Sequence, residues 1–271
     1  MNNIMTADGY TNLRKENKKT NFEKTYTKLI YGAVVASFLI SIIYLVYKLS
    51  SFGQADIPNR EQSDYVLMLL QCVGGLVIIH LPYVLNKGLK VEIPNAMQIF
   101  FSIFLFCAIF LGEVTSFYYI VPHWDSILHG SSGIMIGMLG FMMIAILNKR
   151  QRSKLNLSPF FMALFAFCFA VMVGAVWEIY EFCMDAALGL NMQKAILQSG
   201  EALSGQLAIV DTMKDIIIDT CGAFIAATIG YISVKHKKGW INSYIYKNTT
   251  NVAKTVKKVG RKYKHEEKQA A

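Results

Sequence analysis

Five long stretches of the chain contain no aspartate, glutamate, lysine or arginine, and they constrain the fold more than any other feature. They are Leu29–Tyr47, Tyr65–Asn86, Ile93–Gly112, Gly130–Asn148 and Leu155–Trp177. A helix needs about 20 apolar residues to cross a bilayer core about 30 Å thick. The strands of a membrane barrel would instead alternate polar and apolar side chains. The sequence therefore predicts an all-α, polytopic membrane helical bundle and excludes a soluble globular fold.

A sixth stretch, Ile216–Val234, is long enough to cross a membrane only if Asp219 lies inside it. We include it, because Cys221–Val234 is otherwise uncharged. Six transmembrane helices are then expected, at about 29–49, 65–85, 97–120, 127–147, 159–183 and 213–234. The membrane domain covers 28–235. It follows a basic segment, 1–27, whose Asn, Lys and Thr content predicts disorder, and it precedes a basic tail, 236–271.

Basic residues are distributed unevenly among the segments that connect the spans. When these segments are assigned alternately to two sides, 23 of the 27 basic residues fall on one side. The positive-inside rule makes that side cytoplasmic, so both termini are expected in the cytoplasm. The tail 236–271 is expected to contact the anionic headgroups of the lipid bilayer rather than nucleic acid, because its charges lie next to a span.

Half of the 18 acidic residues fall within 113–219. The predicted topology places most of these near the outer ends of the third to sixth spans. Asp125 and His129 are four residues apart and share a helix face, as do Asp215 and Asp219. A charged side chain deep in lipid costs about 2.5–3.5 kcal/mol. We therefore expect these groups to face the interior of the bundle, where they are paired, protonated or bound to a cation.

These groups predict an acidic and histidine-containing site near the outer leaflet. The expected ligands of a divalent cation are Asp125, His129, Glu178, Asp215 and Asp219, because imidazole and carboxylate groups suit hard and borderline ions. Of these, His129, Glu178 and Asp219 are the candidate catalytic groups. Structural roles are the alternative: Asp125 would cap a helix, and Glu178 would extend toward the membrane surface.

Small residues predict close helix packing around this site. Three glycines lie on the face of the predicted fourth span that carries His129: Gly133, Gly137 and Gly140. Small residues at this spacing let another helix backbone approach closely. Gly174 and Gly222 are expected to supply the facing surfaces.

Three motifs resemble an uncharacterised bacterial inner-membrane family typified by YjdF. They are W-D-x-x-x-H at Trp124–His129, E-x-x-E at Glu178–Glu181, and D-T-x-x-D at Asp211–Asp215 followed by Gly222–Ala223. A looser form of the pattern resembles the VanZ-like family, some members of which are linked to glycopeptide-antibiotic tolerance. The resemblance covers about residues 120–225. It implies a multi-pass protein of the bacterial plasma membrane that shares these polar positions, and it implies no established reaction.

Three functions stay open, because the sequence contains no standard catalytic motif such as HExxH or G-x-S-x-G. The first is an enzyme that acts on a lipid or lipid-linked envelope substrate, and the second is a non-catalytic membrane partner or scaffold. The third, ranked below these, is a small proton- or cation-coupled transporter. It would need polar groups that continue to the inner face, where His80 alone stands out. The sequence leaves the ion and any protein partner unidentified.

Overall fold

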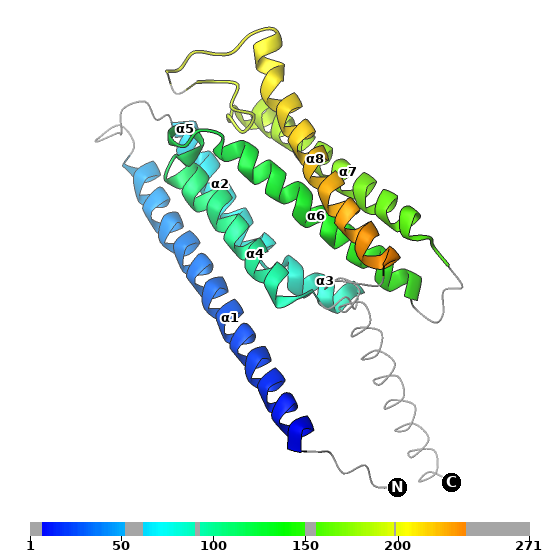
Figure 1. Ribbon diagram of the computed structural model, residues 1–271. Coiled ribbons are helices and arrows are strands. Elements are labelled where there is room, and N and C mark those ends of the chain that lie inside the picture. Colours follow the sequence, from blue (N-terminus) through cyan, green and yellow to red (C-terminus); the bar gives the residue numbers. More distant parts are fainter. Residues whose placement is uncertain (1–6, 52–61, 90–92, 150–155, 198, 237–271) are drawn as a thin grey trace, which may run out of the picture. The chain divides into compact units, whose positions relative to one another are not determined.

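The computed structural model describes residues 7–51, 62–89, 93–149, 156–197 and 199–236 (Figure 1). Within these ranges the chain is helical, and the one β interaction is an isolated bridge between Ile196 and Ala202. The elements are α1 (Ala7–Ser50), α2 (Gln62–Ile78), α3 (Leu81–Leu89), α4 (Asn95–Leu105), the π-helix η1 (Phe106–Val114), α5 (Phe117–Ile120), α6 (Trp124–Lys149), α7 (Pro159–Leu188) and α8 (Gln206–Lys235).

Six helical stretches in the described residues are long and apolar enough to cross a membrane, which confirms the prediction of an all-α protein with six spans. They are Thr25–Ser50, Gln62–Lys87, Asn95–Val114, Trp124–Asn148, Pro159–Leu188 and Gln206–Lys235. Their outward faces carry large apolar side chains such as Ile43, Val77 and Phe160. Helices suit a lipid environment because they satisfy their backbone hydrogen bonds internally.

The N-terminal segment corrects one expectation. Residues 1–27 are predicted to be disordered, but from Ala7 onward they form one helix with the first span. This segment of α1 contains no proline and is rich in lysine, which favours helix. Extending an existing helix also needs no new nucleus. The expected lipid contacts of the basic tail fall almost wholly on residues 237–271, which lie outside the described residues.

The helix ends differ most from the predicted ones in two places. The third span ends at Val114 rather than near residue 120, because Ser116 adopts the left-handed conformation (φ 63°) and separates it from α5. The last part of this span is π-helical, and the Thr115 amide donates to the Phe110 carbonyl at 3.0 Å. The sixth span begins at Gln206 rather than near residue 213.

The chain forms two compact units, and each is described by itself. The first covers 1–87 and 93–124. In it α1, α2, α4 and η1 enclose a core built on Phe38, Tyr65 and Cys72. A polar contact lies at its π-helix, where the Gln71 Nε2 is 3.5 Å from Glu113 Oε1.

The second unit covers 88–92 and 125–271, and it contains α6, α7 and α8 (Figure 1). Glycines allow the backbones of α6 and α8 to touch. A Cβ at Gly133 would overlap the backbone carbonyl of Asp219, and one at Gly222 would lie 2.6 Å from the Gly130 carbonyl oxygen. On α7, a Cβ at Gly174 would lie 2.7 Å from the Asp219 carboxylate. The predicted packing of Gly133 and Gly222 between α6 and α8 is thus confirmed, whereas Gly174 faces Asp219 of α8 rather than the glycines of α6.

Candidate functional site

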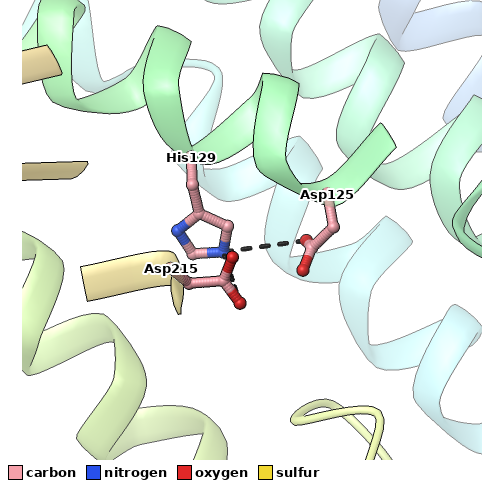
Figure 2. Close-up of side chains that lie close together, drawn as sticks. All are labelled: Asp125, His129 and Asp215. Carbon is pink, nitrogen blue, oxygen red and sulfur yellow. Dashed lines mark ion pairs between the residues drawn. The ribbon is translucent and has the colours of Figure 1, made fainter. Parts of the chain in front are cut away.

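His129, in the second turn of α6, lies among three carboxylates from three helices. Its Nε2 is 3.7 Å from Asp125 Oδ1 on α6, 3.9 Å from Glu178 Oε1 on α7 and 4.0 Å from Asp215 Oδ2 on α8. Figure 2 shows the imidazole, Asp125 and Asp215 converging from α6 and α8. These separations are too long for direct hydrogen bonds, so the four polar atoms surround a common point without bonding to one another.

The other ring nitrogen of His129 has a different partner. Its Nδ1 lies 3.2 Å from Asp219 Oδ2, and Ser132 donates from its hydroxyl to Asp219 Oδ1 at 2.8 Å. A carboxylate accepts hydrogen bonds and cannot donate them when ionised. This side of the ring is therefore held by a direct hydrogen bond. We call Asp125, His129, Glu178, Asp215 and Asp219 together the histidine–carboxylate centre.

The centre is buried and incompletely satisfied. Glu178, Asp215 and Asp219 are each no more than 4% exposed, and His129 is 8% exposed. Glu178 Oε1 and Asp215 Oδ1 have no hydrogen-bond partner in the described part of the chain. Leaving such a group unsatisfied costs about 1–3 kcal/mol, and more when it is charged. A group that interacts with these oxygens would remove this cost.

Three members of the centre could share one ion. Asp125, His129 and Asp215 each offer a ligand atom, and these atoms lie within 4.8 Å of one another. Ligand atoms of a tetrahedral zinc ion are about 3.3 Å apart, from bond lengths of about 2.0–2.1 Å. Small side-chain movements would bring these three atoms to that spacing. Imidazole with carboxylates suits zinc, manganese or iron.

The structure brings the predicted site residues together, and the role of each one stays a prediction. His129, Asp125, Glu178, Asp215 and Asp219, the five predicted ligands, do come together. Asp125, Glu178 and Asp215 lie near His129 Nε2, whereas Asp219 lies near Nδ1. Helical spacing alone does not reveal this difference. Asp125 lies in the first turn of α6, where a negative charge also favours the helix dipole.

Other acidic residues from the same stretch have different partners. Asp185 accepts backbone hydrogen bonds from Met192 at 2.7 Å and Gln193 at 3.0 Å, so it fixes the start of the α7–α8 loop. Asp211 is 3.8 Å from the Lys214 Nζ on a partly exposed helix face. Because α8 begins at Gln206, Asp211 lies in its second turn and does not cap it.

Sequence reasoning missed two polar groups beside the centre. Ser132 is three residues after His129 and therefore on the same helix face, a spacing that could have revealed it. Gln193, in the α7–α8 loop, donates to the Thr212 hydroxyl at 2.9 Å. No periodic signal exists in a loop, so this contact was not predictable. It connects the loop to α8 three residues before Asp215.

Comparison with known proteins identifies relatives of unknown activity. The family described as "Predicted membrane protein (DUF2238)" matches residues 26–236, which include the entire histidine–carboxylate centre. An uncharacterised protein of Thermotoga maritima is 31% identical over 151 residues, which is 55% of this chain and 69% of that protein. No solved structure matches. These matches do not name the YjdF-type or VanZ-like families, so those finer resemblances stay predictions.

Proposed function

Because this chain belongs to the DUF2238 family of membrane proteins, we propose that it is a multi-pass protein of the bacterial plasma membrane, with both termini in the cytoplasm, that binds a divalent cation at its histidine–carboxylate centre. We propose further that this ion serves chemistry on a lipid or lipid-linked envelope substrate. The enzyme proposal goes beyond the family match, since neither the family description nor the Thermotoga relative specifies an activity.

One observation carries the proposal of a cation site. The Nε2 of His129 faces carboxylate oxygens from three different helices at 3.7–4.0 Å. Without a cation, these buried carboxylates would repel one another, and the imidazole alone offers at most one positive charge. A divalent ion at their common point would balance the charge and supply partners for Glu178 Oε1 and Asp215 Oδ1.

Charge on neighbouring residues does not replace the ion. Lys214 lies on the same helix as Asp215, and it forms an ion pair with Asp211 at 3.8 Å, on a face where the lysine side chain is 40% exposed. An exposed pair of this kind contributes little energy. The buried carboxylates around His129 therefore remain to be compensated by a bound cation or by protons.

The depth of the centre supports a lipid-linked substrate. Asp125 and His129 lie in the first two turns of the fourth span, and Asp215 lies in the first third of the sixth. In the proposed topology these starts face outward. A cation at this depth would meet a substrate headgroup at the outer leaflet, where it would polarise an ester oxygen or activate water.

A structural role is the second candidate, and the close contact of α6, α7 and α8 at Asp219 favours it. Asp219 lies where α8 touches Gly133 of α6 and Gly174 of α7. The centre would then hold the helices of a non-catalytic partner or scaffold together, and it would not need a cation. A coupled transporter ranks third, because the five residues of the centre do not extend toward the proposed inner ends of these spans.

Metal analysis separates these proposals. Detergent-purified protein would be loaded with Zn²⁺, Mn²⁺ or Co²⁺, desalted, and analysed by inductively coupled plasma mass spectrometry. We expect about one ion per chain for the wild type, as one histidine can serve one tetrahedral site, and a large loss in His129→Gln and Asp215→Asn. The matched control is Asp211→Asn, one turn away on α8, which should keep the ion. A wild type without metal, or equal loss in the control, would refute the cation site.

A further inference from the structure

We propose that Asp219 is a positioning residue that keeps a proton on His129 Nδ1 and thereby presents Nε2 to the cation, rather than acting as a ligand itself. This inference rests on the proposed function, because it assigns roles within the same centre. It revises the expectation from sequence, in which Asp219 is both a ligand and a catalytic group.

Asp219 lies at the other ring nitrogen of His129 from Asp125 and Asp215. Asp219 Oδ2 is 3.2 Å from Nδ1, whereas Asp125 Oδ1 and Asp215 Oδ2 are 3.7 Å and 4.0 Å from Nε2. The two ring nitrogens point in different directions, so an ion at Nε2 lies on the far side of the ring from this contact. The carboxylate of Asp219 is therefore placed to accept a hydrogen bond from the Nδ1–H group.

Asp219 is also fixed by all three helices of the unit. Its Oδ1 accepts from Ser132 on α6 at 2.8 Å. Its Oδ2 lies close to Gly174 of α7, since a Cβ at that glycine would be 2.7 Å from this oxygen. The backbone carbonyl of Asp219 lies against Gly133 of α6. The side chain is thus confined, and rotation toward the Nε2 side would break both hydrogen bonds.

The chemical consequence follows from the properties of imidazole. A neutral histidine carries a proton on one nitrogen and a lone pair on the other, and the hydrogen bond at one nitrogen decides which. Metal-bound histidines commonly donate their second N–H to a carboxylate, and loss of that partner typically weakens metal affinity about 10–100-fold. Asp219 has this geometry with respect to His129.

The variant Asp219→Asn tests the role directly. Its amide N–H can donate to Nδ1, which would move the imidazole proton to Nε2 and block the ligand position. We expect Zn²⁺ affinity to fall about 10–100-fold, with the ion still binding at saturating zinc. Asp211→Asn is the matched control, and its affinity should equal that of the wild type. With saturating Co²⁺, Asp219→Asn should keep the wild-type visible absorption spectrum, whereas Asp215→Asn should change it because a ligand is lost.

A second measurement does not need metal. In metal-free protein with ¹⁵N-labelled histidine, at a pH at which the imidazole is neutral, the wild type should show a hydrogen-bonded proton on Nδ1 of His129, assigned among the 5 histidines by its absence in His129→Gln. This Nδ1 proton should be lost in Asp219→Asn and kept in Asp211→Asn. If Asp219→Asn keeps the Nδ1 proton of the wild type, as Asp211→Asn should, the positioning role is refuted. It is also refuted if the Co²⁺ spectrum of Asp219→Asn changes as it does in Asp215→Asn.

The outcomes distinguish failure of the two proposals. If the wild type binds no metal but the Nδ1 proton is lost in Asp219→Asn, the cation site fails and the orienting contact stands. Should Asp219→Asn not fold, Ser132→Ala replaces it, since it removes the hydroxyl that contacts Asp219 Oδ1 and the His129 carbonyl oxygen, each at 2.8 Å, and leaves the Asp219 carboxylate in place. Ser132→Ala should lower zinc affinity in the same direction and alter the Nδ1 proton signal, and unchanged affinity and signal would refute the inference.

Discussion

Gly133 of α6 lies directly against the backbone carbonyl of Asp219 on α8, so that even a methyl group at this position would overlap that oxygen. The obstacle is backbone rather than the end of a flexible side chain, and it cannot move without shifting α8. The closest approach of the two helices therefore coincides with the residue that contacts His129.

The first prediction concerns this packing. Gly133→Ala should destabilise the protein by about 1–3 kcal/mol, the usual cost of inserting a methyl group into a filled core. Thermal unfolding in detergent, followed by circular dichroism, measures this. Gly74→Ala is the control, because nothing lies within 4 Å of a Cβ at Gly74, and it should leave the melting temperature unchanged or raise it slightly. Equal destabilisation of both variants would contradict the prediction.

The second prediction concerns removal of the metal. A cation at 100 times its dissociation constant stabilises the folded state by about 2.7 kcal/mol. A chelator such as EDTA should therefore lower the melting temperature of the metal-loaded wild type. It should not change that of Asp215→Asn, because this variant lacks a ligand. An equal shift in both proteins would mean that the chelator acts elsewhere.

The third prediction concerns the loop between α7 and α8. Asp185→Ala removes the acceptor of the Met192 and Gln193 amides, and each group left without a partner costs about 1–3 kcal/mol. Hydrogen–deuterium exchange should become faster in 189–197. Glu201→Ala is the control, since that side chain is exposed. Unchanged exchange in Asp185→Ala would show that other contacts suffice to order the loop.

The fourth prediction concerns topology. Reporter fusions after Lys48, after Asn86 and at the C-terminus should be located outside, inside and inside the cell, respectively, because most basic residues flank the inner ends of the spans. Alkaline phosphatase and green fluorescent protein fusions give complementary signals for the two sides. An external C-terminus would invert the depth of the centre and contradict the proposed access from the outer leaflet.

The sequence was sufficient for the six spans because five of them lack charge over a full bilayer thickness, and the sixth does so apart from Asp219, a property of composition. Helix ends depend on local backbone geometry instead. The left-handed Ser116 has no strong signal in its residue type, so the third span was predicted too long. The start of α8 at Gln206 was placed too late because the prediction followed the uncharged stretch rather than the turn at Gly205, which has a φ of 62°.

In the histidine–carboxylate centre too, the sequence predicts which residues meet but not how they are oriented. Spacing alone placed Asp125 beside His129 and predicted that Asp215 and Asp219 would reach the same site. Which ring nitrogen each carboxylate faces depends on the packing of three helices, in particular at Gly174. A periodicity argument contains no information on that rotation, and so it could not distinguish ligands from a positioning residue.

The π-helix η1 has a consequence for how relatives of this chain can vary in length. Such segments accommodate one extra residue within an α-helix, and here the segment Phe106–Val114 ends beside the contact between Glu113 and Gln71. Deleting one residue before Glu113 would restore α-helical hydrogen bonding but turn this side chain by about 100° around the helix axis. The direction of the Glu113 side chain is therefore tied to the number of residues in the third span.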